Sequence, residues 1–391
     1  MSNDDRRVRM RLAMEAQKLD TLILRLPENV LLLSEHWPMI GAAYLVFPLE
    51  GKATCILPAC YEQDILGSLE DCDPKFFSYG GAGDPPLNSS VRAQLKQAVS
   101  PDSRRIGYEG NFEVVAPSWN AAESMVPAAD ALTLLRETFT NSELIDVTQL
   151  LITGRMRKTQ YEIERLDIAS EISCFALAAF QEAVEVGICG VELAAIVEHA
   201  AMVKGTGYKG SVRVRAFAQV TTGALETSEA HRPNVISTTR KMEDGEFAVL
   251  ELGLVADGYW ADRTRVRIAG TARDPQIKIY ETVRRAQEAA VAAICTGVRA
   301  RDVDRAARSV IEDAGFGPYF PHVTGHGLGF RYHESFPILG PNSDDILEEG
   351  AMTSVEPGIY TTAFGGCRIE DDVIVTNEGP RILGPYLKNL N

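Results

Sequence analysis

The sequence has no long run of apolar residues and no cysteine pattern typical of disulfide frameworks or thiolate metal sites. No stretch approaches the roughly 18 consecutive apolar residues of a transmembrane helix, so we expect no membrane span. The 7 cysteines are odd in number and show no CxxC spacing, which disfavours disulfide pairing. The segment Met1 to Arg11 mixes acids and bases without an apolar stretch, which predicts no secretory signal and a reduced, cytoplasmic setting.

Positive charge is also scarce. Lys and Arg total 39 against 54 Asp and Glu, and the net charge is −15. No basic patch that would neutralise phosphates stands out, which disfavours nucleic acids and anionic membranes as partners. The composition, 45% hydrophobic and 24% charged, is that of a globular protein, and a length of 391 residues suits two domains better than one core.

The first domain, residues 1–150, is predicted to be an α/β unit. The turn signal Leu49 to Lys52 predicts a hairpin between the β-rich segments on either side. The expected elements are a helix over Arg6 to Leu19, strands over Thr21 to Leu26, Ala42 to Pro48, Ala53 to Pro58 and Arg105 to Tyr108, and a loop over Gly80 to Pro86.

The second domain, residues 151–391, follows a junction predicted within residues 142–158. Thr159 and Glu162 have the spacing of a capping box, in which each side chain satisfies a free backbone N–H group of the other. The helix that begins there is predicted to reach about Val186 and to stop at Gly187.

An internal repeat is indicated by glycines in this second domain. Gly187 and Gly297, Gly205 and Gly315, and Gly207 and Gly317 each stand 110 residues apart. A long helix is expected before the first glycine of each copy, and a shorter one over Val191 to Lys204 and over Asp302 to Ala314. A duplication explains the match better than chance does, and two similar halves would create a pseudo-twofold cleft, a natural place for a site.

Four acids are placed in two predicted hairpins, one in each half. Glu251 lies in an apolar segment, and Asp262 follows it after the turn signal Ala256 to Gly258. The hairpin puts both acids on facing strands, about 4.8 Å apart, where they can share one ion.

The second hairpin has the same design. Glu356 follows the strand-like Thr353 to Val355, the residues Ala363 to Gly366 supply a turn, and Glu370 lies on the return strand. A single acid of this kind is better explained by an exposed edge strand or by a salt bridge to Arg368 or Arg265. Four acids in two matched hairpins favour a cation site, since a buried acid is costly unless it is paired or bound to metal.

Histidine supplies the nitrogen ligand of this predicted site. Of 6 histidines in the chain, His322, His326 and His333 fall in one glycine-rich stretch, whose glycines would allow the backbone to approach a ligand closely. Four carboxylates and one imidazole suit one or two Mn²⁺, Co²⁺, Fe²⁺ or Zn²⁺ ions. A pair of such ions can activate water and polarise a carbonyl group.

These residues resemble the motifs of the creatinase, prolidase and methionine aminopeptidase superfamily. GHGLGFRYHE is similar to its GHGIG…HE signature, SVEPGIY to its EPG segment, CRIEDDVIVT to its RIED strand, and DGYWADRTR to its GY.SD.TR hairpin. The resemblance implies a creatinase-like α/β N-terminal domain and an α+β C-terminal domain with the pita-bread fold and its pseudo-twofold internal repeat.

The resemblance also implies roles for individual residues. The implied metal ligands are Glu251, Asp262, His326, Glu356 and Glu370, although the family usually has Asp at the position of Glu251, so an ion there would shift or bind more weakly. His333 would stabilise the oxyanion, His322 would help to bind substrate, and Arg368 would orient Glu370 and contact substrate. His231 resembles a family histidine near the leaving group, or is a loop histidine without a role. His36 lies where a family N-terminal domain can reach a partner's site.

The predicted activity is metal-dependent hydrolysis of the peptide bond that precedes proline in a dipeptide or short peptide. Glu356 would shuttle the proton of the attacking water. A homodimer that uses Mn²⁺ is implied by the resemblance. One alternative is creatinase-like cleavage of a C–N or C–S bond in a small molecule by a metal-poor enzyme on the same fold, which is favoured by Glu251 in place of Asp. Another is a binding protein without activity, which predicts an eroded site.

Overall fold

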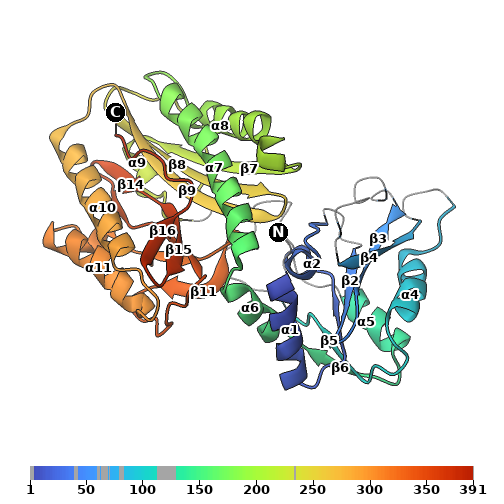
Figure 1. Cartoon of the computed structure of the whole chain (residues 1–391). Coiled ribbons are helices and arrows are strands. Elements are labelled where there is room, and N and C mark those ends of the chain that lie inside the picture. The colour runs from blue at the N-terminus through green and yellow to red at the C-terminus, as the bar shows by residue number, and fades with distance from the viewer. Residues whose placement is uncertain are drawn as a thin grey trace. The chain divides into compact units, whose positions relative to one another are not determined.

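The computed structural model describes residues 4–38, 43–59, 62, 69, 71–78, 83–111, 129–232 and 235–390. Two compact units divide the chain, and along the described residues the division falls between Arg155 and Met156, inside the predicted junction of 142–158. Each unit is described by itself (Figure 1).

The N-terminal unit is an α/β structure around one sheet. The strand order is β4-β3-β2-β1-β5-β6. Strand β2 is antiparallel to both of its neighbours, β1 and β3, and the other neighbouring strands pair in parallel. Its elements are α1 (Asp4–Ala16), β1 (Thr21–Leu24), α2 (Pro27–Ser34), β2 (Tyr44–Pro48), β3 (Ala53–Pro58), β4 (Cys72–Phe77), α4 (Leu87–Ala98), β5 (Arg105–Tyr108), α5 (Ala129–Thr138), β6 (Glu143–Asp146) and α6 (Thr148–Met156).

The predicted first helix, strands and hairpin of this unit are confirmed, with ends that differ by a few residues. Of the predicted loop, Gly80 to Ala82 lie outside the described residues, and residues 83–86 have no helix or strand. The helices α4 and α5 pack on the sheet through Leu95 and Leu134, which join strand residues such as Ile56 and Ile106 in one buried cluster.

The start of α2 is held by a buried acid from another part of the unit. Leu26 precedes this helix and its side chain provides no cap. Glu109, which follows β5, accepts hydrogen bonds from the backbone N–H groups of Arg25 (2.8 Å) and Leu26 (3.0 Å) and from the Asn29 amide (2.9 Å). These bonds satisfy donors at the helix start. Burial outweighs them and raises the pKa of Glu109 to about 7.

The C-terminal unit contains two successive sets of helices and strands. Its elements are α7 (Gln160–Ala183), α8 (Gly190–Gly205), η2 (Tyr208–Gly210), β7 (Val214–Thr222), α9 (Gly223–Ser228), β8 (Glu246–Ala256), β9 (Tyr259–Ala269), α10 (Asp274–Ala292), α11 (Ala300–Asp313), η3 (Gly317–Tyr319), β10 (Gly325–Gly327), β11 (Glu334–Leu339), β12 (Met352–Val355), β13 (Gly358–Thr361), β14 (Gly365–Arg368), β15 (Asp371–Thr376) and β16 (Gly379–Ile382).

The first set packs α7 and α8 against the antiparallel sheet β7-β8-β9 (Figure 1). The predicted capping box is confirmed: Thr159 accepts from the Glu162 N–H, and the Glu162 carboxylate accepts from the Thr159 N–H. The helix ends at Ala183, a few residues before the predicted end. Leu177 and Phe180 of α7 are buried against apolar strand residues such as Leu252, which fixes the side of β8 that faces the helices.

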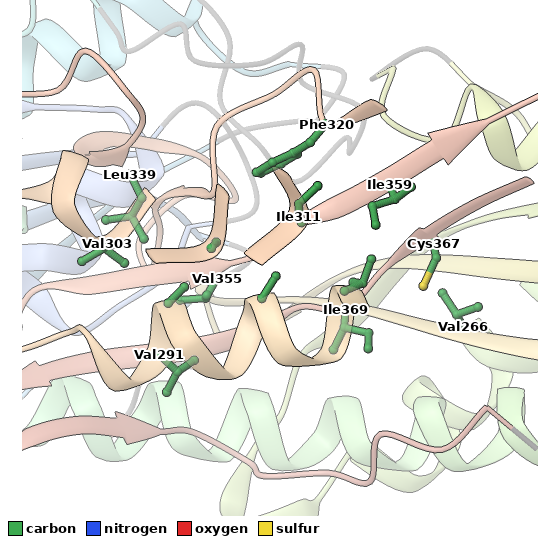
Figure 2. Packing of buried hydrophobic residues seen from close by; sticks show 14 of the residues in the cluster. Val266, Val291, Val303, Ile311, Phe320, Leu339, Val355, Ile359, Cys367 and Ile369 are labelled. Carbon is green, nitrogen blue, oxygen red and sulfur yellow. The ribbon is translucent and has the colours of Figure 1, made fainter. Parts of the chain in front are cut away.

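The second set packs α10 and α11 against the strands that carry the second pair of acids. Val291, Val303 and Ile311 from these helices meet Val355 and Ile369 in one buried cluster (Figure 2). Val355 and Ile369 are fully buried and adjoin Glu356 and Glu370 in the sequence. Because successive strand side chains alternate between faces, these apolar anchors turn the two acids away from the core.

The repeat is visible in the order of elements, but two of the three glycine pairs are not equivalent. Gly187 and Gly297 both have positive φ, and each donates its N–H to a carbonyl further along its half, Met242 and Leu347. The second helix is 16 residues long in one half and 14 in the other. The left-handed glycine after that helix is therefore Gly207 in the first half and Gly315 in the second.

No helix among the described residues combines the length and the apolar character needed to cross a bilayer.

The pH dependence of unfolding tests the environment of Glu109. Its pKa rises from the ordinary value of 4.5 to about 7 in the fold, so the folded chain holds a proton that the unfolded chain has lost between these values. Wild-type stability therefore falls as the pH rises through this window. Gln at this position cannot titrate, so the stability deficit of Glu109→Gln should shrink from about pH 5 to about pH 8. Thermal unfolding across this range measures the difference.

The matched control is Glu15→Gln, at an exposed position of α1, which should follow the wild type at every pH. A deficit of Glu109→Gln that is constant or grows with pH would contradict the buried, proton-holding carboxyl group.

Candidate metal centre

The first pair of acids lies on the β8–β9 hairpin. Asp257 (φ 50°) and Gly258 (φ 91°) form its turn, and positive φ at both positions matches the twist of the strands. In the register, Glu251 lies opposite Thr264 and Asp262 lies opposite Gly253. The two acids are thus on facing strands, as predicted, but diagonal to each other by two positions.

The second pair of acids lies between two hydrogen-bonded ladders of one hairpin. Val355 pairs with Asp371 at the end of the β12–β15 ladder, and Gly358 pairs with Arg368 at the start of the β13–β14 ladder. The register is the same on both sides of the gap. Glu356 and Glu370 occupy this gap on opposite strands, so they face each other directly.

His326 lies in the middle of the short strand β10, which pairs with β11 and β12. The glycines on either side of it serve these neighbouring strands. A Cβ atom on Gly325 would overlap the Ser354 carbonyl, and one on Gly327 would overlap the Phe336 carbonyl. The prediction that these glycines admit a ligand is therefore wrong for Gly325 and Gly327, which let three strands pack closely.

The predicted acids and histidines meet at one place. Among the described residues, three overlapping groups have ligand atoms within 4.8 Å of one another. The groups are Asp262, His326 and His333; His326, Glu356 and Glu370; and Glu251, Asp262 and Glu370.

The imidazole of His326 is oriented for ligation. Its Nδ1 lies 2.9 Å from the Gly327 carbonyl oxygen, which can only accept, so Nδ1 carries the proton. Burial lowers the pKa of His326, and the ring is neutral with a lone pair on Nε2. That lone pair faces Asp262 Oδ2 at 3.5 Å and Glu356 Oε1 at 3.4 Å, so three acceptor atoms converge in an arrangement that is suited to a cation.

The carboxyl groups are crowded and incompletely satisfied. Both oxygens of Asp262 and Oε1 of Glu370 have no hydrogen-bond partner among the described residues, and both side chains are almost fully buried. Burial raises the pKa of each well above its usual range, and the neighbouring carboxylates raise it further. Unpaired buried oxygens around a neutral imidazole fit a divalent ion, which would restore the missing charge.

Glu251 has a different environment from the other acids. Its Oε2 accepts from Arg368 Nη2 and from the Thr264 hydroxyl (2.7 Å), and its Oε1 accepts from the Tyr332 hydroxyl (2.8 Å). Burial raises its pKa but Arg368 and these hydrogen bonds outweigh burial, so the pKa of Glu251 is lowered. It is an ionised carboxylate with a protein counter-ion.

The Arg368 guanidinium group donates hydrogen bonds to several side chains and to one backbone carbonyl. Besides Glu251, it donates to the Thr264 hydroxyl (2.9 Å), the Ala230 carbonyl (3.0 Å) and the Tyr360 hydroxyl (3.2 Å). None of these hydrogen bonds joins Arg368 to Glu370, so they do not include the predicted direct orientation of Glu370. The connection runs through Thr264, whose hydroxyl also lies 2.7 Å from Glu370 Oε2.

The remaining predicted histidines line the same region. His322 donates from Nδ1 to the Val323 carbonyl (2.7 Å), so its Nε2 accepts from the Tyr360 hydroxyl (2.9 Å), and burial lowers its pKa to about 3. The His333 ring lies 4.3 Å from the His326 ring, and the His231 ring lies 5.0 Å from the Tyr360 ring. His36 belongs to the N-terminal unit, and its role stays a prediction.

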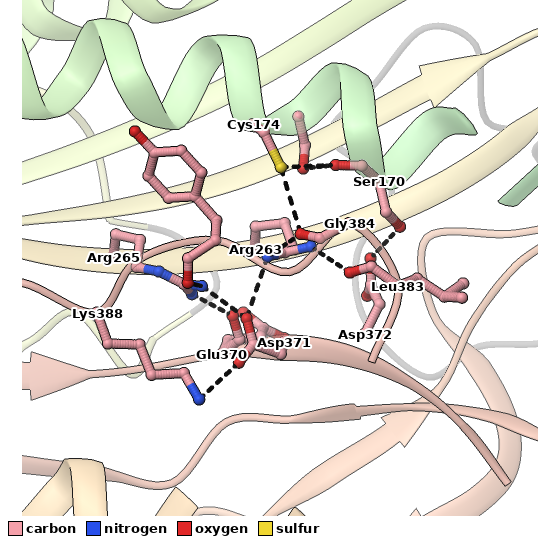
Figure 3. Close-up of polar contacts among 12 residues, drawn as sticks. Ser170, Cys174, Arg263, Arg265, Glu370, Asp371, Asp372, Leu383, Gly384 and Lys388 are labelled. Atoms are coloured by element: carbon pink, nitrogen blue, oxygen red, sulfur yellow. Dashed lines mark hydrogen bonds and ion pairs between the residues drawn. The ribbon is translucent and has the colours of Figure 1, made fainter. Parts of the chain in front are cut away.

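A buried ion network lies on the opposite face of the strands that carry these acids. Asp371 accepts from Arg265 (2.6 Å) and Arg263 (3.1 Å) and pairs with Lys388 at 3.0 Å (Figure 3). These cations outweigh burial and hold the pKa of Asp371 well below its usual range. Arg263 also donates to the Leu383 and Gly384 carbonyls, which ties the C-terminal segment to β9.

Several residues of the site were missed in the sequence. Thr264 had a signal, because it lies two positions after Asp262 on one strand and so shares its face. Asp371 and Arg263 lie in the same two motifs, at the positions between those of the predicted site residues, and Arg265 was considered only as a salt-bridge partner of an acid. Tyr332 and Tyr360 had no signal of their own, since their contacts join segments distant in the sequence.

The comparisons with known proteins agree with this arrangement. The model of metallopeptidase family M24 matches residues 164–377. This chain belongs to that family. A putative dipeptidase of Bacillus subtilis is 36% identical over 256 residues, 66% of this chain and 68% of that protein. An Xaa-Pro dipeptidase of Lactobacillus helveticus is 35% identical over 63% of this chain and 64% of its own length.

The fold agrees along the whole chain with that of a solved relative. The Xaa-Pro dipeptidase from Bacillus anthracis superposes with a TM-score of 0.80 at 25% identity, covering 100% of this chain and 99% of that one. The M24 member described here is therefore a hydrolase of the metallopeptidase type, with an α/β N-terminal part and a pita-bread C-terminal part.

Loss of the Asp371 charge should destabilise the C-terminal unit. Asp371→Asn leaves the guanidinium groups of Arg263 and Arg265 buried without a counter-ion, and breaking such a pair costs about 3–5 kcal/mol. The free energy of unfolding in urea measures the loss.

Glu171→Gln is the control, because it breaks the partly exposed pair of Glu171 with Lys209 and should cost much less stability than Asp371→Asn. Equal stability of the two variants would show that the network does not hold the strands together.

Proposed function

We propose that this M24 hydrolase is a metal-dependent peptidase that cleaves the peptide bond preceding proline in dipeptides or short peptides. The observation that carries the proposal is the neutral His326 with its Nε2 facing two carboxylates. Two relatives bear the name Xaa-Pro dipeptidase, which supports the substrate class.

The ion would be held by Asp262, His326, Glu356 and Glu370. A divalent ion in such a site supplies Lewis acidity, which polarises the scissile carbonyl and lowers the pKa of water. The donor set is rich in carboxylates, which favours Mn²⁺ among the expected ions.

Glu356 is the residue suited to move the proton. Burial raises the pKa of Glu356 to about 8, with a further rise from Glu251 and an opposing effect of Arg368. A bound ion would lower this pKa, and a carboxylate beside the ion is placed to accept a proton from water. In the proposal it takes the proton of the attacking water and returns it to the prolyl nitrogen, which needs this proton to leave as an amine because its anion is too basic to be expelled.

The histidines would position the substrate around this centre. His333 lies next to His326 and is placed to donate to the developing oxyanion. His322 lines a cavity of about 770 Å³ together with Ser335, Ile338 and Arg308. The residues that line this cavity include none of the candidate ligands, so we assign substrate contact to His322, His231 and Arg368 from the family resemblance. Tyr360 connects His322 and Arg368 by hydrogen bonds.

A second candidate function is favoured by Glu251. The family usually has Asp there, and the longer side chain is engaged by Arg368, Thr264 and Tyr332. A change of charge distribution at one end of the site is compatible with creatinase-like cleavage of a C–N or C–S bond in a small molecule.

Other features of the proposal rest on the family resemblance. We propose a creatinase-like N-terminal domain over residues 1–150 and a catalytic domain over residues 151–391. We also propose that the protein is a homodimer and is located in the cytoplasm.

The substrate class is tested with peptides that differ at one position. In the presence of Mn²⁺, Ala-Pro or Ala-Pro-Ala should be hydrolysed before proline faster than Ala-Ala or Ala-Ala-Ala, as measured by release of the N-terminal alanine. Absence of prolyl cleavage together with turnover of creatine would replace the first candidate by the second.

The role of Glu356 is tested by Glu356→Gln. The variant retains the shape of the side chain but cannot carry the proton, so kcat should fall by about 10²–10⁴-fold. Bound Mn²⁺ is measured in parallel, to separate proton transfer from ion binding. Glu348→Gln, at an exposed position of the same unit, is the control and should retain wild-type turnover. Full activity of Glu356→Gln would remove Glu356 from the mechanism.

A further inference from the structure

A lysine and a glutamate form a buried ion pair outside the candidate metal centre. Lys158 Nζ lies 2.7 Å from Glu334 Oε2, and the two side chains are 0% and 4% exposed. Lys158 precedes α7 and Glu334 begins β11, so the pair joins segments 176 residues apart. Because burying two charges is costly, such a pair is weak evidence for stability, but it can specify one arrangement of the chain.

The lysine side chain packs against the loop 328–333, which follows β10. A Cβ atom on Gly329 would lie 2.7 Å from Lys158 Cε, and the positive φ of this glycine, 137°, would strain any other residue. The ammonium group lies 5.9 Å from the centre of the Phe330 ring. The Gly329 carbonyl accepts from the Trp260 N–H at 2.8 Å. This glycine therefore makes room for the lysine while its own backbone is bonded to β9.

Glu334 connects the lysine to the other end of the same loop. Its Oε1 accepts from the Phe330 N–H at 3.1 Å, while its Oε2 pairs with Lys158. The backbone of Lys158 is fixed in turn, since its N–H donates to the Gly350 carbonyl at 2.7 Å. One carboxylate thus holds both ends of the segment 330–334 against an anchored lysine.

The segment held in this way carries His333. The His333 ring lies 4.3 Å from the His326 ring and 4.4 Å from the Tyr332 ring. His333 directly precedes Glu334, so a displacement of the glutamate would also move the imidazole. A catalytic group misplaced by about 1 Å can lose about 10²-fold in rate.

We propose that Lys158 is a positioning residue for catalysis: through Glu334 it holds the loop so that the His333 imidazole stays beside His326. Lys158 acts through one carboxylate and not on the substrate itself. The inference rests on the proposed function, because it concerns the placement of the residue to which that function assigns the oxyanion.

The test is a double-mutant cycle of Lys158→Met with His333→Ala, measured on the full chain with Mn²⁺ and Ala-Pro. Met retains the length of the lysine but lacks the ammonium group. In the wild-type background Lys158→Met should lower kcat by about 10²-fold and change KM by less than about 3-fold. In the His333→Ala background the same substitution should lower kcat by less than about 3-fold. Bound Mn²⁺ per chain should stay at the wild-type level.

Two further variants separate positioning from stability. Lys158→Met/Glu334→Gln removes both buried charges, so its free energy of unfolding should recover toward the wild-type value while its kcat stays low. This variant also covers the case in which Lys158→Met fails to fold. Lys209→Met is the matched control, because it breaks the partly exposed pair with Glu171, and it should retain the wild-type kcat.

Amide hydrogen exchange of the segment 328–334 gives a measurement that needs no substrate. The Phe330 N–H is bonded to the Glu334 carboxylate, so this segment should exchange faster in Lys158→Met than in wild type. Exchange in Lys209→Met should equal that of wild type.

The outcomes separate this inference from the proposed function. Full kcat or unchanged exchange in folded Lys158→Met, with prolyl cleavage by wild type intact, would overturn the inference alone. An equal fall of kcat in the two backgrounds would do the same, as would loss of bound Mn²⁺, because the lysine would then act on something other than His333. Absence of prolyl cleavage by wild type would overturn the proposed function and the inference with it.

Discussion

Buried negative charge is the constraint on which the C-terminal unit depends. Carboxyl groups removed from water are stable when a cation or a set of donors replaces the lost hydration. Asp262 on β9 lies on one face of these strands together with Glu370, and Asp371 at the start of β15 lies on the other face. Each face meets this requirement in its own way. On one face Asp371 is neutralised by Arg263, Arg265 and Lys388. On the other face Asp262 and Glu370 keep oxygens that are unpaired among the described residues.

The alternation of strand residues separates these two environments. In the segment Asp262 to Arg265, the acid and Thr264 face the candidate metal centre, while the two arginines face Asp371. Glu370 and Asp371 divide in the same manner. The protein-neutralised network therefore lies directly behind the centre, and it fixes the backbone of both acid-bearing strands. Rigid strands of this kind hold ligands in place before an ion binds.

Much of this could be predicted from the sequence, for identifiable reasons. The capping box at Thr159, the Asp257–Gly258 turn and the acid pairs are local patterns, and each is confirmed by the fold. His326 was assigned to the site from its glycine-rich stretch and the family resemblance, although β11 and residues 340–351 separate it from the second hairpin. The chemistry of the site was thus accessible from motifs that each span a few residues.

What could not be predicted depends on contacts between distant segments. The hydrogen bonds from Arg368 and Tyr332 to Glu251 span 117 and 81 residues, and nothing in either local sequence specifies them. The glycine repeat was misread for a related reason: the second helix is shorter in one half, so equal spacing in sequence did not mean equal position in the fold. The glycines beside His326 were assigned to a ligand, whereas neighbouring strands occupy the space.

A cation, and not a set of shared protons, is proposed to balance the unpaired acids around His326. Diffraction from crystals grown with Mn²⁺, recorded at the manganese absorption edge, distinguishes the two. We expect an anomalous peak within bonding distance of His326 Nε2 and of Asp262, Glu356 and Glu370. A map without a peak, in which these carboxyl groups contact one another through shared protons, would contradict the proposal that a cation binds here.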